Sequence, residues 1–145
     1  MKKFICSIAI AAIVLQACNT KNDYEAVFSN PLLYSNITNQ LTEVITYDIF
    51  TPPVASRIYA YGHLAAYEVM AHGNTKYSTL NGQLKDWENV PSPPAGAPIQ
   101  YQFAATLALM QIGEALTFSK ETTVAIIDSL HQLAKNHGMP NDMYN

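Results

Sequence analysis

The sequence predicts an all-α protein, a bundle of about four helices with one long proline-rich loop. Apolar residues recur at helical spacing in four segments, and a proline or a capping residue stands at the start of each segment. Between the second and third segments, closely spaced helix breakers forbid regular structure: Pro91, Pro93, Pro94, Gly96 and Pro98. We expect Trp87 to hold this loop against the helices.

Residues 1–17 have the pattern of an export signal. Lys2 and Lys3 supply positive charge, an apolar stretch runs from Phe4 to Leu15, and Leu15-Gln16-Ala17-Cys18 resembles a lipobox. Cys18 is therefore predicted to be the mature N-terminus and the site of lipid attachment, with residues 18–28 as a polar tether. An ordinary secretory signal with an incidental cysteine is the alternative, and the apolar stretch is short for a membrane span.

The first helix is predicted to start at Pro31, with Ser29 or Asn30 as its cap, and to run to about Ile49. Its apolar stripe contains Leu33, Ile37, Leu41 and Val44. Asp48 lies on this stripe near the C-terminal end of the helix, where the helix dipole repels a carboxylate, so it needs a partner. We expect an ion pair with Arg57; a cap on the next helix or exposure to solvent are the alternatives.

The second helix is predicted to start at Pro52 or Pro53 and to reach about Met70. One face carries Val54, Ile58, Tyr61, Ala65 and Val69, and the opposite face carries Ser56, Tyr59, His63, Tyr67 and Met70. Between these faces Ala55, Gly62 and Ala66 form a strip of small residues where another helix could approach closely. Arg57 and Glu68 mark the edge expected to face water.

The third helix is predicted from Pro98 to about Phe118, and its apolar composition indicates a central core helix. A fourth helix begins after Ser119 and ends at Gly138, with Val124, Ile127, Leu130 and Ala134 on its inner face. A further turn or helix is expected at Asn141 or Asp142. Because two of the helices are apolar on more than one face, residues 29–145 are expected to be the N-terminal part of a larger α-helical domain.

The second helix carries a resemblance to a known family. Two prolines, an arginine four residues after the second proline, and histidine, alanine and tyrosine at helical intervals resemble the N-terminal helices of bacterial vanadium-dependent haloperoxidases, which belong with the type 2 phosphatidic acid phosphatases. The matching residues are Asp48, Phe50, Pro52, Pro53, Ala55, Ser56, Arg57, Tyr59, Ala60, Tyr61, Ala65, Ala66, Tyr67 and Glu68. A weaker likeness extends from about Ser29 to Gly138.

The resemblance implies that the chemistry lies outside this chain. In that family vanadate or a phosphoryl group is held by three motifs: lysine, six residues, Arg-Pro; Pro-Ser-Gly-His; and Ser-Arg, five residues, histidine and a nearby aspartate. None is present here, and Arg57 is the only arginine, whereas such an oxyanion cradle needs at least two. We therefore expect no catalytic residue, no metal ligand and no bound cofactor in this chain, with vanadate possible in a full-length parent.

Several polar residues remain as structural candidates. His63 shares a face with Tyr59 and Tyr67, an arrangement that could bind an anion or relay a proton, although a buried histidine bonded to tyrosine is the simpler interpretation. Asp48 and Arg57 complete the set. His131 and His137 are six residues apart on different faces of one helix, and we expect both to be solvated.

Composition excludes some classes of function. Without residues 1–17 the chain has six basic and eleven acidic side chains, which argues against binding nucleic acid. Cys6 and Cys18 are the only cysteines, so a disulfide is not expected in the folded part. The expected partners are the membrane, through the N-terminal lipid, and the remaining C-terminal helices of the parent domain.

Two functions follow from the sequence. The first is the N-terminal, non-catalytic part of a lipid-anchored haloperoxidase or acid phosphatase-like enzyme, exported to the periplasmic side of a membrane or to the cell surface. The alternative is a self-contained small helical lipoprotein that acts as a binding or scaffolding module, with the proline-rich loop and Trp87 as its contact surface.

Overall fold

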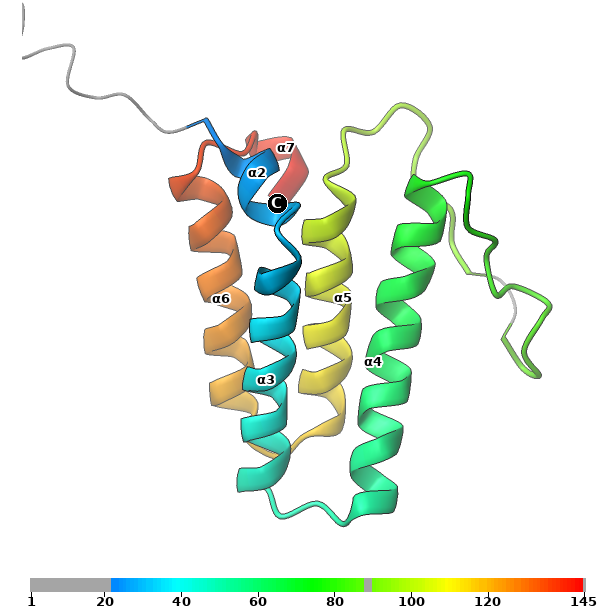
Figure 1. Ribbon diagram of the computed structural model, residues 1–145, viewed down its shortest axis with the longest axis vertical. Coiled ribbons are helices and arrows are strands. Elements are labelled where there is room, and N and C mark those ends of the chain that lie inside the picture. Colours follow the sequence, from blue (N-terminus) through cyan, green and yellow to red (C-terminus); the bar gives the residue numbers. More distant parts are fainter. Residues whose placement is uncertain (1–21, 88–89, 145) are drawn as a thin grey trace, which may run out of the picture.

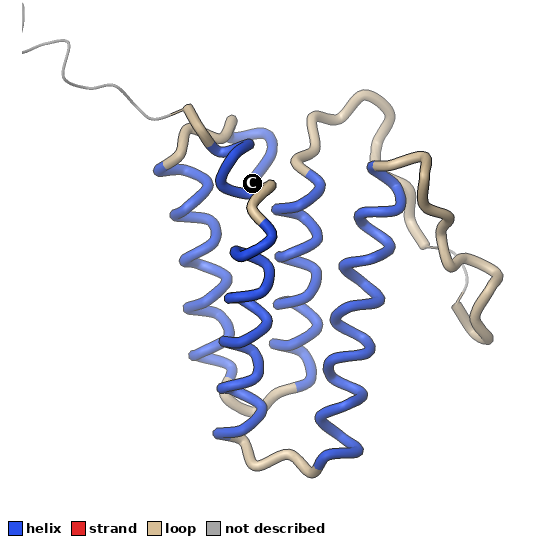
Figure 2. The backbone as a smooth tube through the Cα atoms, in the orientation of Figure 1, coloured by secondary structure: helices blue, strands red, loops and turns tan. Residues whose placement is uncertain are grey.

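The computed structural model describes residues 22–87 and 90–144, and these residues form helices and loops without a strand (Figures 1 and 2). In chain order the helices are α2 (Tyr24–Phe28), α3 (Pro31–Tyr47), α4 (Pro52–Gly73), α5 (Tyr101–Leu116), α6 (Lys120–Asn136) and α7 (Asn141–Tyr144). The predicted all-α bundle of four long helices is confirmed, and the expected further turn near residue 141 is the short helix α7.

Helix α5 is the centre of the bundle. It packs against α3, α4 and α6, whereas α4 lies at one side and packs mainly against α5 (Figure 1). The core is built from large, fully buried side chains: Leu41, Phe103, Leu109, Met110 and Leu130. Three of them, Phe103, Leu109 and Met110, come from α5. The prediction of a central third helix is therefore confirmed.

Local capping explains where the helices start. The Asn30 side chain accepts a hydrogen bond from the Leu32 amide at 3.0 Å, and Pro31 occupies the first position of α3. Helix α4 begins at Pro52, as predicted. Helix α5 begins at Tyr101 rather than Pro98, because the Gln100 side chain accepts from the Phe103 amide at 2.6 Å and so caps the helix three residues later than expected.

Two glycines allow the helices to approach closely. A Cβ atom on Gly62 of α4 would lie 2.7 Å from Leu109 Cδ1 of α5, and a Cβ atom on Gly113 of α5 would lie 2.7 Å from Leu41 Cδ1 of α3. Real side chains cannot come so close. The small strip predicted on α4 is therefore where α5 packs.

The predicted inner faces are correct for α3 but shifted elsewhere. On α4 the buried face centres on Ile58, Gly62 and Ala66, and Tyr61, expected beside Ile58, is 50% exposed. Helix α6 buries Thr123, Ile126, Leu130 and Ala134, while Val124, expected inside, is 42% exposed. Thr123 can be buried because its hydroxyl donates to the Lys120 carbonyl at 2.9 Å.

Helices α3 and α6 end in the same type of turn. After α3, the Ile49 amide donates to the Thr46 carbonyl and the Phe50 amide to the Ile45 carbonyl. After α6, Gly138 and Met139 make the equivalent bonds to Lys135 and Ala134. Both are Schellman motifs, in which the first residue past the cap adopts positive φ: 55° at Ile49 and 76° at Gly138.

The described residues cover only part of the segment to which the N-terminal predictions refer. The export signal and the lipid site Cys18 lie outside the described residues. The expected tether, residues 18–28, is helical at its end, because α2 places Phe28 in the core against Phe103, with ring centroids 4.9 Å apart. In the described ranges no helix is long and apolar enough to cross a membrane.

The connection from α4 to α5 is a long loop, as predicted (Figure 2). Trp87 lies at a pocket of about 480 Å³ between this loop and the two helices, together with Val69, His72 and Tyr101. The indole Nε1 is buried and has no hydrogen-bond partner among the described residues. The expectation that Trp87 packs the loop onto the bundle agrees with this position.

Candidate functional site

The tyrosines and the histidine predicted on one face of α4 lie at the groove between α3 and α4. The Tyr34 hydroxyl of α3 and His63 Nδ1 of α4 form a hydrogen bond of 2.8 Å. The Tyr59 hydroxyl donates to Thr42 Oγ1 at 2.9 Å, which links the same two helices a second time. The structure therefore pairs His63 with a tyrosine of another helix rather than with Tyr59 or Tyr67.

Tyr67 has a different role. Its hydroxyl donates to the Ser78 carbonyl at 2.9 Å, and its ring lies edge-on to Tyr77 with centroids 6.4 Å apart. These contacts hold the start of the loop against α4. The three predicted residues of this face thus make three separate contacts, and they do not converge on one point.

A largely apolar pocket of about 360 Å³ opens beside the Tyr34–His63 pair. Ala66 and Met70 of α4, Ala105 of α5 and Phe28 of α2 contribute to its wall. Burial raises the pKa of Tyr34 above its ordinary value, so the phenol stays protonated over the physiological range. The pair is suited to bridge two helices, which favours the simpler of the two interpretations of His63.

Asp48 holds together the two turns at one end of the bundle. Its carboxylate accepts from the Phe118 amide at 2.7 Å, from the Ser119 amide at 3.1 Å and from Ser119 Oγ at 2.5 Å. The Ser119 hydroxyl chiefly, and the two amides in addition, hold the pKa of Asp48 below its ordinary value against the opposing effect of desolvation. These donors stand immediately before α6, whose N-terminus also favours a negative charge.

The expected ion pair between Asp48 and Arg57 is wrong. Arg57 is exposed, and in the described part of the chain the one side-chain ion pair joins His137 to Asp23. Asp48 finds its donors in the turn between α5 and α6, about 70 residues later in the chain, and these satisfy both carboxylate oxygens. The alternative that Asp48 caps the next helix, α4, is also wrong, because its donors belong to Phe118 and Ser119, which stand just before α6.

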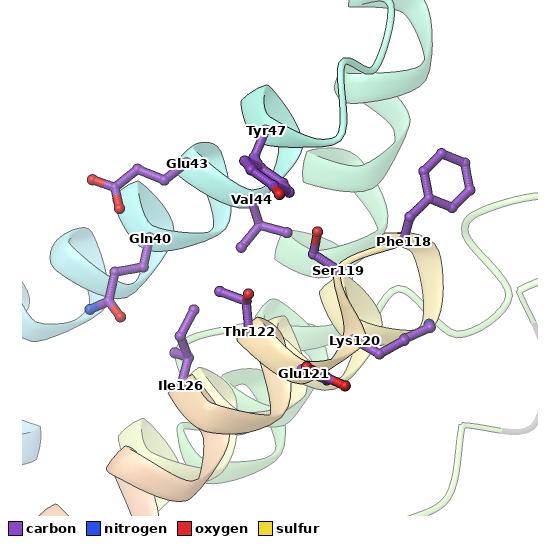
Figure 3. Close-up of a pocket in the computed structure, with 10 residues that line it drawn as sticks. All are labelled: Gln40, Glu43, Val44, Tyr47, Phe118, Ser119, Lys120, Glu121, Thr122 and Ile126. Atoms are coloured by element: carbon purple, nitrogen blue, oxygen red, sulfur yellow. The ribbon is translucent and has the colours of Figure 1, made fainter.

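Figure 3 shows the pocket next to Ser119, which has a volume of about 700 Å³. Gln40, Glu43 and Tyr47 come from α3, and Thr122 and Ile126 come from α6. The lining mixes both charge signs, because Glu121 and Lys120 also contribute. The pocket thus lies between the C-terminal part of α3 and the N-terminal part of α6.

Glu68 was expected at the solvent edge and is buried instead, with 4% of its surface exposed. Its carboxylate accepts from Thr79 Oγ1 at 2.6 Å and from the Leu80 amide at 2.5 Å. The correction has a simple cause: the loop folds back along α4 and covers this side chain. Glu68 is thus the anchor of the loop.

His131 in α6 and His137, the residue that follows this helix, are half-buried rather than solvated as expected. His137 Nδ1 lies 2.5 Å from Asp23 Oδ1, and the His137 carbonyl accepts from the amides of Asp23 and Tyr24. His131 packs edge-on against Phe103, with ring centroids 5.6 Å apart. Because α2 was not predicted, the partner of His137 could not be anticipated.

The described residues do not fit a vanadate site. Vanadate is an oxyanion and needs several cationic donors that converge on it. Arg57 is the chain's one arginine, and the Lys120 ammonium donates to the Glu114 carbonyl. Within the described ranges, no three His, Cys, Asp or Glu residues gather in a way that could hold a metal ion.

The chain is similar to a solved structure, the crystal structure of a bacterial vanadium-dependent iodoperoxidase. The two are 38% identical and superpose with a TM-score of 0.67 over 72% of this chain. The match covers 25% of the iodoperoxidase chain, so this chain spans about a quarter of that protein's length. No protein-family profile and no curated protein sequence matches the chain.

Proposed function

We propose that this chain is the N-terminal, non-catalytic helical part of a vanadium-dependent haloperoxidase-like enzyme. The observation that carries the proposal is the 38% identity to a bacterial vanadium-dependent iodoperoxidase, shared over a superposable all-α fold. The resemblance of the second helix to the same family, noted from the sequence, supports it independently of the fold.

In this proposal the chain has a structural role, and the residues that hold the oxyanion belong to the rest of the parent enzyme. Two features support a purely structural role for this part. Tyr34 bonds to His63 of another helix, Asp48 bonds to the turn before α6, and Glu68 bonds to the loop, so these polar side chains make structural contacts. The described residues also lack a convergent set of cationic donors. Vanadate, when bound in the parent, would supply the peroxide chemistry that oxidises halide. The other activity open to such a parent enzyme is hydrolysis of phosphomonoesters, as in the acid phosphatases of the same superfamily.

The test uses the full-length product of the native gene. We expect a polypeptide several times longer than 145 residues that carries the lysine, arginine and histidine motifs named above. After loading with vanadate it should oxidise iodide or bromide with hydrogen peroxide, and inorganic phosphate should inhibit it by competition. The 145-residue chain, assayed in parallel, should be inactive.

Two results would contradict the proposal. One is a full-length product without halide oxidation and without phosphatase activity at any vanadate or phosphoester concentration. The other is a native product of 145 residues that folds cooperatively as a monomer, which would favour the self-contained helical module.

We further propose that the protein is exported and anchored by a lipid on Cys18, in the cell envelope on the periplasmic side of a membrane or at the cell surface. The support is the sequence pattern Leu15-Gln16-Ala17-Cys18 after an apolar stretch. Cys18→Ser should move the protein from the membrane fraction to the soluble fraction, whereas Cys6→Ser should not. Retention of Cys18→Ser in the membrane fraction would refute the lipid anchor.

A further inference from the structure

Three large apolar side chains are strongly exposed at one end of the bundle. Tyr47 is 80% exposed, Ile49 87% and Phe118 75%. Tyr47 is the last residue of α3, Ile49 belongs to the turn from α3 to α4, and Phe118 belongs to the turn from α5 to α6. Both turns lie at the same end of the bundle (Figure 1). We call these three residues the end surface.

The end surface is held rigidly. Asp48 bonds to the amides of Phe118 and Ser119 and so joins the two turns. The rings of Phe50 and Phe118 stack at a centroid distance of 4.8 Å. Figure 3 shows Tyr47 and Phe118 on either side of Ser119 at the pocket between α3 and α6. A partner would therefore meet a surface that is already formed.

Ile49 is the residue that points to a partner. It occupies the position of the Schellman motif where φ is positive, and a β-branched residue is unfavourable there. The matching position after α6 is Gly138, and glycine adopts positive φ without strain. The next residue, Met139, is buried, with 4% of its surface exposed. An isoleucine at this position strains the turn and gains no burial inside the described chain. Its side chain gains a stabilising role only if another segment covers it.

We propose that the end surface is the docking surface for an apolar segment of the same protein that follows residue 145. This inference rests on the proposed function. The matched iodoperoxidase chain is about four times as long as the part covered here, so such a protein has ample polypeptide to cover this end. Helix α7 lies at the opposite end of the bundle (Figure 1), so the covering segment must first run the length of a helix such as α6, about 25 Å for 17 residues.

The first experiment measures thiol accessibility in the full-length product. Residues 22–145 contain no cysteine, so Ile49→Cys adds one thiol to this part of the protein. Lys85→Cys and Asp128→Cys, at exposed positions of the loop and of α6, are the controls. We expect the thiol at position 49 to react with a maleimide at least tenfold more slowly than both control thiols, with mass spectrometry of the peptides assigning the label.

The second experiment depends only on the sign of a shift. Ile49→Gly removes the unfavourable side chain from a left-handed position, so on an uncovered surface it should raise the Tm. On a covered surface the lost burial outweighs the relief of strain, and the Tm of the full-length protein should fall. Because the turn is exposed in the bundle, this variant is expected to fold.

The outcomes separate the possibilities. Labelling at position 49 as fast as at the controls, or a raised Tm for Ile49→Gly, would overturn the docking surface while leaving the proposed function intact. Protection that disappears on dilution, together with a dimer at high concentration, would assign the surface to a second copy and refute the covering segment. A native product of 145 residues would remove the proposed function and this inference with it.

Discussion

Asp48 shows how one carboxylate joins two distant turns. Its pKa is lowered by donors that exist only in the folded state, so its protonation weakens the fold. The contribution is fully present above the unfolded-state value near 3.8 and is lost as the pH falls through the lower folded-state value. We expect the Tm difference between the wild type and Asp48→Asn to be large at pH 6 and to shrink at pH 3.

The control for this prediction is Glu43→Gln, which removes an exposed carboxylate on α3, the helix that Asp48 follows. It should have a small effect on Tm that changes little between the two pH values. A difference between wild type and Asp48→Asn that is equal at pH 6 and pH 3 would show that the charge of Asp48 does not stabilise the fold.

The Tyr34–His63 bond gives a second prediction for a single residue. Tyr34→Phe removes the bond across the α3–α4 groove and keeps the ring in place. A hydrogen bond of this kind contributes about 1 kcal/mol to the free energy of unfolding. Urea titration should find a loss of that size, whereas Tyr47→Phe, at an 80% exposed position of the same helix, should leave the stability unchanged.

What could be predicted for single residues depended on how far along the chain their partners lie. Asn30 as a cap was predictable because its donor is two residues away. The partners of Asp48 and His137 lie 71 and 114 residues away, and no spacing rule reaches so far. Tyr34 was missed for the same reason, since it carries no signal that connects it to His63.

At the scale of helices, the contact between α4 and α5 depends on Gly62. In an ordinary helix Gly→Ala stabilises by about 1 kcal/mol. Here the new methyl group would overlap the fully buried Leu109 side chain, at 2.7 Å from its Cδ1, and would lie 3.4 Å from the Leu109 carbonyl oxygen, which a change of rotamer cannot move. We expect Gly62→Ala to destabilise the protein by about 1–2 kcal/mol in urea titrations.

A double-mutant cycle checks the cause. If the clash is with Leu109, Gly62→Ala combined with Leu109→Ala should be less destabilised than the sum of the two single variants. Strict additivity would mean that the predicted overlap is not the source of the effect.

The loop between α4 and α5 is expected to depend on Glu68. Glu68→Ala leaves the Thr79 hydroxyl and the Leu80 amide without their acceptor, so this part of the loop should detach from α4. Trypsin should then cut faster after Lys76 and Lys85, which are both exposed. Glu121→Ala, at an exposed position of α6, should leave the cleavage rate unchanged; equal rates for both variants would argue against the anchor.

Helix positions could be read from the sequence better than helix faces. Prolines and caps are local signals, and they located the start of α3, α4 and α6. The face of α6 was misjudged because Thr123 satisfies its own hydroxyl through the Lys120 carbonyl and can then replace an apolar residue in the core. The burial of Glu68 could not be predicted, since it depends on the path of a loop without periodicity.

At the scale of the whole molecule, the four long helices are unequally supported. Helix α5 packs on three neighbours, whereas α4 packs mainly on α5 and buries two apolar side chains, Ile58 and Ala66, where α3 buries four. Local opening requires less free energy where fewer apolar contacts must break. Amide hydrogen exchange should therefore protect the middle of α5 most and the middle of α4 least in the 145-residue chain, and equal protection of the two helices would contradict this order.

The position of Trp87 also has a practical consequence. It is the only tryptophan in the chain, and it lies in the loop outside every helix. Intrinsic fluorescence will therefore report on the loop, while far-ultraviolet circular dichroism will report on the helices. Two spectra of one unlabelled sample can thus separate the release of the loop from the melting of the bundle.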